Sequence, residues 1–336
     1  MSTSAVLRSP MSPVVRGWRA CFAPVDRVRN LPAIFDPARA GQFDPDAPPS
    51  PWIDAGWIEN FTRTQKTRFT SVRSGPKGAT AAQCRTELDA GVAFDFRQWG
   101  KLQMALSGPF EHVNVLAEAN GASAAPSGGT PASAVAVQSG STATQIVLGT
   151  SGVASFNPGD LVAVDIDYAG QTGYVGTGVC AAYVKSAAGL GVDHIRRVTF
   201  NVSRVAQKTS TALLLGQPLL GGVPAASAKV QKVLAFADRE GGSFTPEWSA
   251  LFLLEAETGA RVFFYYPRLQ PCASAGEIFT SLNDVSSAKA SGSLTDAISA
   301  AGLHASFTAL PYADPVDGEP VLCWRSYVPA GNSAVY

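Results

Sequence analysis

Hydrophobic and polar residues alternate over several short stretches of the chain, and this period of two predicts strands. Val92, Phe94 and Phe96 alternate with Ala93 and Asp95, which indicates a strand with one buried face. Residues 262–266 are apolar or aromatic throughout, as expected of a central strand or of one covered by another subunit. Further strands are expected at 162–168, directly after the turn 157–160, and at 173–184, 195–205, 212–215, 304–310 and 321–328.

Helical spacing is confined to two short segments. Trp99, Leu102 and Leu106 recur at the helical period, and Gly108-Pro109 is expected to end that helix. A second short helix is predicted over 293–302, where Ser and Asp form a capping box. The last two predicted strands are expected to form a hairpin with a long loop. These patterns predict a mainly β fold with a short helix.

Changes in composition divide the chain. Residues 1–50 contain eight prolines and little periodicity, which predicts an extended N-terminal arm or disorder. We expect a core made of 51–116 and 236–336, a β-sandwich or barrel, with an inserted small antiparallel β domain at 117–235. The small residues of 119–133 mark a linker at the insertion. Isolated apolar residues suggest that the arm lies on a surface, a partner subunit being one candidate: Val14, Val15, Trp18, Phe22, Val25 and Val28.

Charge is scarce and balanced. Charged residues make up 15% of the chain, hydrophobic ones 46%, and the formal net charge is zero. Proteins that grip nucleic acid through phosphates usually carry a basic excess, so a dedicated DNA binder is disfavoured. Basic and acidic residues number 14 and 11 in 1–130, 7 and 4 in 131–235, and 5 and 11 in 236–336. This asymmetry is either surface variation or a sign that copies meet head to tail.

Cysteine usage and the N-terminus predict an intracellular place of synthesis. No secretory signal and no membrane-spanning run is recognised in the sequence. The glycosylation-type triplets at Asn60 and Asn201 therefore carry no weight. The cysteines form no metal-type cluster and are expected to be reduced, packed thiols. They are Cys21, Cys84, Cys180, Cys272 and Cys323.

Motifs for nucleotides and metals are weak. Residues 176–181 match GxGxxA, but their flanks are predicted strands and Asp193 lies between strands, so a bent strand is the better interpretation. Residues 75–78 (Gly-Pro-Lys-Gly) are interpreted as a turn. His112, His194 and His304 are isolated from one another, which gives zinc chemistry little support.

The sequence likewise gives little support for a catalytic site. Asp165 and Asp167 share a strand face, where paired carboxylates hold calcium or act as acid and base, although a solvated face is favoured. The aromatic residues 263–266 are interpreted as core rather than a base-stacking platform. No catalytic, cofactor-binding or metal-binding residue is assigned, and no cofactor. The expectation is a protein that is not an enzyme.

Two segments resemble tail proteins of long-tailed bacteriophages. Residues 84–107 resemble the strand-then-helix region of tail tube proteins, through Phe94, Phe96, Trp99 and Leu102. Residues 155–165, with 213–219 and 223–225 downstream, are similar to the β domain inserted into many such tail proteins.

The resemblance implies a structural virion protein. Its fold would be a tail-tube-like β-sandwich or barrel whose copies form rings, usually hexameric. Stacked rings would build a hollow conduit for DNA ejection, so genomic DNA passes through the lumen without sequence-specific binding. Other partners would be tail proteins such as the tape measure, terminator or sheath, with no membrane; the protein would be made in the host cytoplasm and end in the tail. The inserted domain would face outward, and deleting 1–50 would leave a folded monomer that polymerises poorly.

Two other classes stay open at this point. A tail-tip or adhesin-type module would bind host carbohydrate through exposed aromatic residues and need not polymerise. A β-rich hydrolase is the remaining alternative, since catalytic triads assemble from distant positions.

Overall fold

The computed structural model confirms a mainly β fold with short helices. It describes residues 15–25, 31–49, 51–74, 78–117, 134–165, 200–225, 228–240, 245–257, 259–272, 276–278 and 302–330. The chain divides into two compact units: unit 1 comprises Met1–Ala23, Pro32–Pro109 and Thr245–Tyr336, and unit 2 comprises Pro24–Leu31 and Phe110–Phe244.

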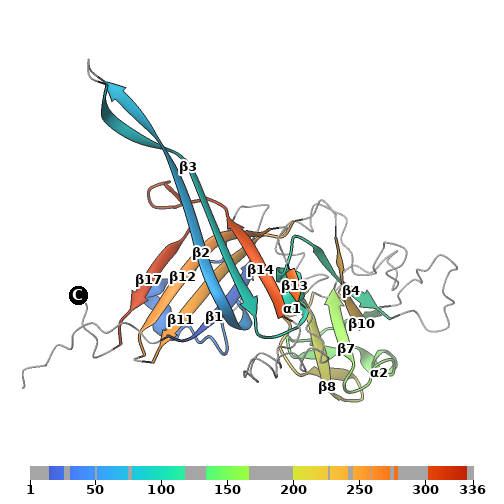
Figure 1. The fold of residues 1–336 in the computed structure, drawn as a ribbon. Coiled ribbons are helices and arrows are strands. Elements are labelled where there is room, and N and C mark those ends of the chain that lie inside the picture. Colours follow the sequence, from blue (N-terminus) through green and yellow to red (C-terminus); the bar gives the residue numbers. More distant parts are fainter. Residues whose placement is uncertain are drawn as a thin grey trace, which may run out of the picture. The chain divides into compact units, whose positions relative to one another are not determined.

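Unit 1 is built on one antiparallel sheet that closes on itself (Figure 1). Its strands follow the order β13-β14-β3-β2-β1-β11-β12-β17, and β14 also pairs with the end of β12. This second pairing makes a ring of six strands, with β13 and β17 added outside it. The strands are β1 (Val15–Pro24), β2 (Ile53–Ser74), β3 (Ala79–Phe96), β11 (Trp248–Ala256), β12 (Arg261–Pro271), β13 (Gly276–Ile278), β14 (Gly302–Ala309) and β17 (Trp324–Val328). The remaining elements are the 3-10 helix η1 (Pro37–Gln42), α1 (Lys101–Leu106), β15 (Tyr312–Ala313) and β16 (Pro320–Val321).

Aromatic rings fill the inside of the six-stranded ring. Phe22 of β1 is fully buried, and its ring centroid lies 5.6–6.4 Å from four other aromatic rings. Those rings belong to Phe94, Trp248, Phe252 and Phe307, so β3, β11 and β14 all contribute. Aromatic pairs are stable in tilted and edge-on geometries at this spacing. The cluster therefore holds together strands that are far apart in the sequence.

Most of the proline-rich N-terminal segment belongs to this unit, which differs from the expected extended arm. Residues 20–23 of β1 are at most 3% exposed, because β1 lies between β2 and β11. Residues 31–49 cover the outer face of the sheet, where Phe35 and Phe43 pack with Phe263 and other residues of β11 and β12. Prolines fit here because most of this segment needs no sheet hydrogen bonds. The segment therefore lies on the barrel of its own chain, where a partner subunit was one candidate surface.

Polar contacts fasten this covering segment to the barrel. The Tyr265 hydroxyl donates to the Ala33 carbonyl at 2.8 Å, and the Ala33 N–H donates to Ser249 Oγ at 2.9 Å. Arg19 of β1 forms a two-pronged contact with Asp54, at 3.0 and 2.6 Å, and also pairs with Asp46. The hydrogen bonds from Arg19 to Asp54 raise the pKa of its guanidinium, which therefore stays charged.

Several local predictions for unit 1 are confirmed. Val92, Phe94 and Phe96 are buried, at 2%, 0% and 5% exposure, as the alternation indicates. Residues 263–266 are buried core in β12, which pairs with β11 on one side and with β17 and β14 on the other. α1 buries Leu102 and Leu106 as expected.

Two predictions for unit 1 are wrong. Trp99 precedes α1 and is 43% exposed, because the helix begins only at Lys101. β14 and β17 are not paired with each other, since each pairs with a different part of β12. The loop between β14 and β17 instead holds the small β15–β16 pair. The helix predicted over 293–302 falls in 279–301, outside the described residues, except for Gly302, which begins β14.

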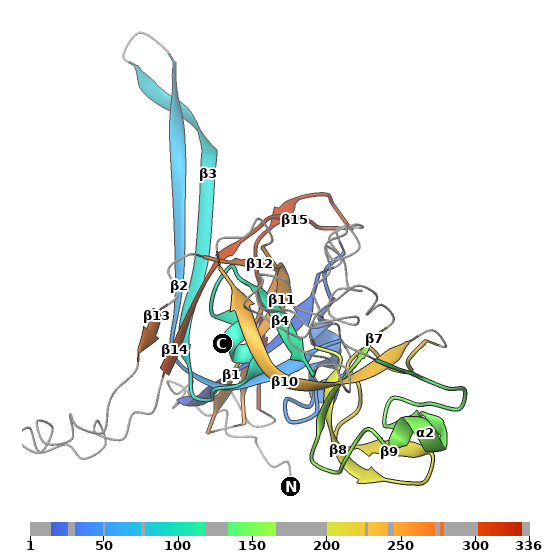
Figure 2. The same cartoon turned by 90° about the vertical axis from the view of Figure 1, so that its right-hand side faces the viewer.

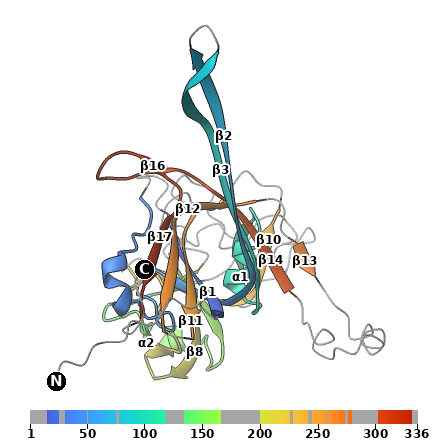
Figure 3. The ribbon, with the colours of Figure 1, turned by 60° about the vertical axis from the view of Figure 1, so that its left-hand side comes forward.

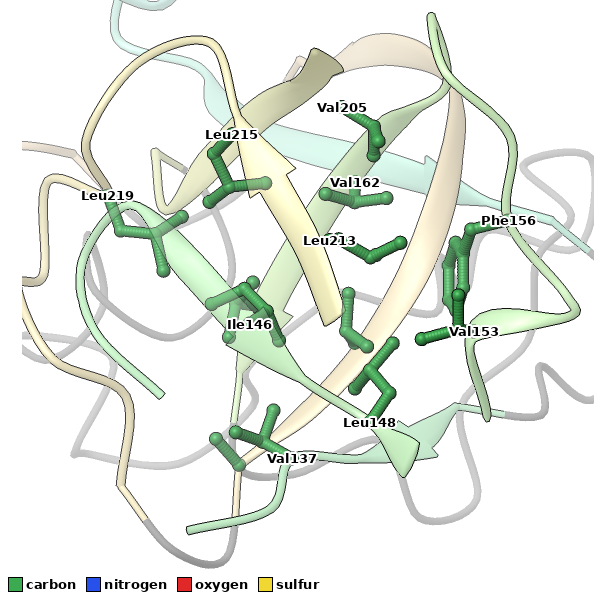
Figure 4. Packing of buried hydrophobic residues seen from close by; sticks show 13 residues of the cluster. Val137, Ile146, Leu148, Val153, Phe156, Val162, Val205, Leu213, Leu215 and Leu219 are labelled. Atoms are coloured by element: carbon green, nitrogen blue, oxygen red, sulfur yellow. The ribbon is translucent and has the colours of Figure 1, made fainter. Parts of the chain in front are cut away.

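Unit 2 is a second antiparallel β structure with its own core. Its strands follow the order β4-β10-β7-β8-β9-β6, with β5 paired to β10. The elements are β4 (Glu111–Leu116), β5 (Val135–Ala136), β6 (Gln145–Val147), α2 (Gly149–Val153), β7 (Leu161–Asp165), β8 (Val202–Lys208), β9 (Ala212–Leu215) and β10 (Lys229–Arg239). Figure 4 shows Ile146, Val162, Val205 and Leu213 pointing toward one another in a core that Phe156 closes.

The predicted strands of the inserted domain are partly described. Residues 161–165 form β7, but Ala163 is buried together with Val162 and Val164, so both faces are covered where one was expected. The strand at 212–215 is present, and the one at 195–205 begins at Val202 within the described part. Residues 166–168 and 173–184 lie outside the described residues. The longer segment of unit 2 is Phe110–Phe244, whereas the expected insertion spans 117–235.

Candidate assembly surface

The long hairpin of β2 and β3 is the candidate assembly surface of unit 1. β1 pairs with β2 only over residues 53–58, and β14 pairs with β3 only over 91–96. Beyond these limits, residues 65–74 pair with 79–90 alone. Ten residues of a strand span on the order of 30 Å. The hairpin therefore leaves the barrel of its own unit as a two-stranded ribbon, as Figures 2 and 3 show.

Side chains of this ribbon are exposed on both faces. Every residue from Thr62 to Arg73 is exposed, and so is every residue from Thr80 to Glu87. Phe69 and Val72 are large apolar side chains with 57% and 50% exposure. A two-stranded ribbon is only marginally stable in water, and exposed apolar groups gain from being covered. The surface of this hairpin has the character of a contact surface.

Charge on the hairpin is predominantly basic. Five basic and two acidic residues lie between 65 and 90. Arg68 forms a cross-strand ion pair with Glu87 at 3.2 Å, and both are well exposed, so this pair adds little stability. Arg73 and Arg85 form no ion pair with any described residue. The ribbon therefore presents apolar and basic groups together.

Local sequence explains the hairpin, although no strand was predicted over 62–74 or 79–90. Threonines recur through 62–70 beside Phe69 and Val72, and such residues favour strands. The turn predicted at 75–78 falls between the end of β2 and the start of β3. A polar strand-forming run on each side of a Gly-Pro turn was the available signal. It lacks apolar alternation, because neither face meets a core.

At the base of the hairpin, Arg63 lies over the end of the aromatic core. Its guanidinium carbon is 4.4 Å from the Phe264 ring centre and 5.6 Å from that of Tyr266. Arg63 Nε donates to the Tyr266 hydroxyl at 2.6 Å, and Nη2 donates to Cys323 Sγ at 3.6 Å. Burial raises the pKa values of both the Tyr266 phenol and the Cys323 thiol, so both are neutral at pH 7. A cavity of about 330 Å³ opens here.

The two described histidines each face a carboxylate across neighbouring strands. His112 Nδ1 lies 2.5 Å from Asp238 Oδ1 in unit 2, and His304 Nδ1 lies 2.7 Å from Asp95 Oδ1 in unit 1. In both cases the partners are directly opposite in the strand register. Cross-strand pairs of this kind stabilise sheets. His194 lies outside the described residues.

The cysteines occupy different environments. Cys21 is buried, and that burial raises the pKa of its thiol to about 12. Cys84 is exposed on the hairpin, so the expectation that all the thiols are packed is wrong for this residue. Cys272 and Cys323 are partly exposed, and Cys180 lies outside the described residues.

Other candidate residues have structural roles or lie outside the described part. Asn60 has a positive φ of 52° at a bulge in β2 and donates to Asp95 Oδ2 at 2.6 Å. Asn201 is 4% exposed; it donates to the Val164 carbonyl and accepts from the Gly221 N–H. The motif at 176–181, Asp167 and Asp193 lie outside the described residues, as does the side chain of Asp165.

The described residues contain neither a metal-type side-chain cluster nor a membrane-spanning helix. No group of three or more His, Cys, Asp or Glu side chains lies close enough to hold a metal ion in this part of the chain. Across the same residues, no helix combines the length and the apolar character that a membrane crossing requires.

Comparison with known proteins found no match among the models of protein families and none among curated proteins.

Proposed function

We propose that this chain is a structural subunit that assembles with further copies of itself. The observation that carries the proposal is the β2–β3 hairpin, whose described residues are exposed on both faces from Thr62 to Arg73 and from Thr80 to Glu87. A second copy would cover Phe69 and Val72 and give the ribbon a packing partner, which the described residues of unit 1 do not provide.

The particular assembly that we propose is the tail tube of a long-tailed bacteriophage, built of stacked rings around a conduit for DNA. Such a tube needs one contact within the ring and another between rings. In the described part of the chain, β17 is hydrogen-bonded only to β12, so its other edge is available within a ring. The hairpin is then the contact between rings. The zero net charge suits a conduit through which DNA slides.

The test is electron microscopy of the purified protein over a range of concentrations, comparing the natural chain with Phe69→Asp. We expect rings or hollow tubes from the natural chain. Covering the exposed part of Phe69 would contribute roughly 1–2 kcal/mol, so the charged variant should assemble only at a concentration about tenfold higher. Circular dichroism should show that the variant is folded, because Phe69 lies outside both cores.

Leu234→Asp is the matched control. Leu234 is 67% exposed on β10 of unit 2, so the same change is made away from the hairpin and should leave assembly unchanged. A natural chain that stays monomeric at every concentration would refute the assembly proposal. Discrete monomers or trimers that bind glycan would favour the tail-tip or adhesin alternative. If Phe69→Asp forms tubes at the concentration at which the natural chain does, the hairpin is not the contact between rings.

A further inference from the structure

The cavity at the base of the hairpin contains a positive charge that no described residue neutralises. Its lining combines Arg63, Leu88 and Ala90 of the hairpin with Tyr266 of β12 and with residues 320–323. Arg63 is the only charged residue of that lining. The ion pairs among the described residues include none with Arg63.

The groups that hold the guanidinium are neutral. Tyr266 accepts from Nε and Cys323 from Nη2, while the aromatic ring of Phe264 supports one face of the guanidinium. Arg63 is therefore oriented without being neutralised, and its Nη1 has no hydrogen-bond partner among the described side chains. A guanidinium has five N–H donors in a planar fork, which matches a carboxylate or phosphate in geometry.

The rest of the cavity selects between those anions. The lining provides one cation, the neutral polar side chains of Thr64 and Gln65, and apolar side chains such as Leu88 and Leu322. A phosphate near pH 7 carries nearly two negative charges and is usually held by several donors, whereas a carboxylate carries one. One guanidinium beside an apolar wall therefore fits a monocarboxylate with an apolar body.

We propose that this cavity binds a carboxylate, which pairs with Arg63 while its apolar part contacts Leu88 and Leu322. The carboxylate belongs either to a free organic acid or to an Asp or Glu side chain of a second copy of this chain. Only the second source rests on the assembly proposed above.

Protection of Cys323 from alkylation measures occupancy, because its Sγ lies beside the guanidinium. The probe is phenylacetate at 20 mM, with dilute protein at pH 8.5 and ionic strength held constant with sodium chloride. If the dissociation constant is about 10 mM, alkylation of Cys323 by iodoacetamide should slow about threefold. Exposed Cys84 is the internal reference in the same molecule and should react at an unchanged rate.

Two probes of matched kind test the chemistry. Phenylacetamide has the same shape without the charge and should not protect Cys323; equal protection would overturn the role of the carboxylate. Inorganic phosphate at the same ionic strength should protect less than phenylacetate, and stronger protection by phosphate would overturn the assignment to carboxylates. No protection by phenylacetate would overturn the proposal outright.

Variants of Arg63 test the residue. Arg63→Met keeps the length of the side chain without charge and should abolish the protection. Arg63→Lys keeps the charge without the planar fork, and it serves if the methionine variant does not fold; protection should fall to less than half. Full protection in a folded variant of either kind would overturn the role of Arg63. Arg68→Met, on the exposed hairpin, is the matched control and should protect as the natural chain does.

A second arm identifies the source. If the carboxylate comes from another copy, assembly alone should slow alkylation of Cys323, and phenylacetate should compete with assembly. If assembly leaves Cys323 as reactive as before while dilute protein is protected by phenylacetate, the source is a free acid. If the chain does not assemble but phenylacetate still protects Cys323, the proposed function is refuted and the carboxylate site is supported.

Discussion

Phe22 offers the sharpest test of the fold, because the sequence places it in a proline-rich arm and the structure places it at the centre of the barrel. Its side chain is fully buried and touches aromatic residues from three other strands. Phe22→Ala removes a ring whose space the neighbouring rings cannot fill by small movements. The variant should therefore lose the stability contributed by burial of the ring and by the packing contacts that the ring makes with its neighbours.

The expected loss is about 3–5 kcal/mol of the free energy of unfolding, the range for Phe→Ala in a packed core. Urea denaturation monitored by tryptophan fluorescence suits the measurement, because the Trp248 ring centroid lies 6.4 Å from that of Phe22. Ile34→Ala is the control from the same segment: Ile34 is 64% exposed, so its loss should stay within about 0.5 kcal/mol.

A loss below about 1 kcal/mol for Phe22→Ala would refute the placement of β1 in the core. The same reasoning changes the expectation for deletion of residues 1–50. The sequence predicts a folded monomer, whereas the structure predicts that unit 1 opens between β2 and β11. A truncated chain with native circular dichroism and a cooperative unfolding transition of unit 1 would contradict this expectation.

Two further predictions concern pH and a buried amide. Burial raises the pKa of the Cys21 thiol from 9.0 to about 12, so the stability that its neutral form contributes is fully present below pH 9 and declines as the pH rises from 9 toward 12. At pH 10 the free energy of unfolding should be smaller by about 1 kcal/mol. Urea midpoints at pH 7 and pH 10 measure this loss, which should be smaller in Cys21→Ala, and an equal loss in both proteins would refute the assignment. Asn201→Ala leaves the Val164 carbonyl and the Gly221 N–H without their partner, so unit 2 should lose about 1–3 kcal/mol in thermal or urea unfolding. Asn201→Asp keeps an oxygen acceptor for Gly221 but removes the donor and adds a buried negative charge opposite the Val164 carbonyl, so it should lose at least as much stability. An unchanged stability in both variants would contradict the role of the amide.

Local patterns predicted several of the elements in which a segment meets a core, although they missed β1, β10 and β11. The alternation at 92–96 identified buried and partly exposed positions, and the continuous apolar run at 262–266 identified a strand covered on both sides. α1 was predicted from Leu102 and Leu106, while Trp99 was misplaced because one position beyond the helix start still matches a helical spacing. Such patterns can be recognised in the sequence because the buried face of a strand or helix requires apolar residues at its own regular period.

The hairpin and the cavity beneath it were not predicted, for two different reasons. Residues 62–87 have no hydrophobic period, because the described side chains of the ribbon, 62–73 and 80–87, are exposed and do not pack into a core. Arg63 and Cys323 are 260 residues apart, and only the path of β2 past the loop before β17 brings them together. Spacing along the chain holds no information about such a contact.

By itself the sequence determined the mainly β class, the strands at 92–96 and 262–266, and the short helix that follows the first of them. Tertiary structure alone decided that the proline-rich segment supplies β1 and covers the barrel, and that β14 and β17 pair with different parts of β12 instead of with each other. The physical reason is that secondary structure follows from local burial and backbone preference. Strand order and ring closure depend instead on which distant aromatic residues fill one shared interior.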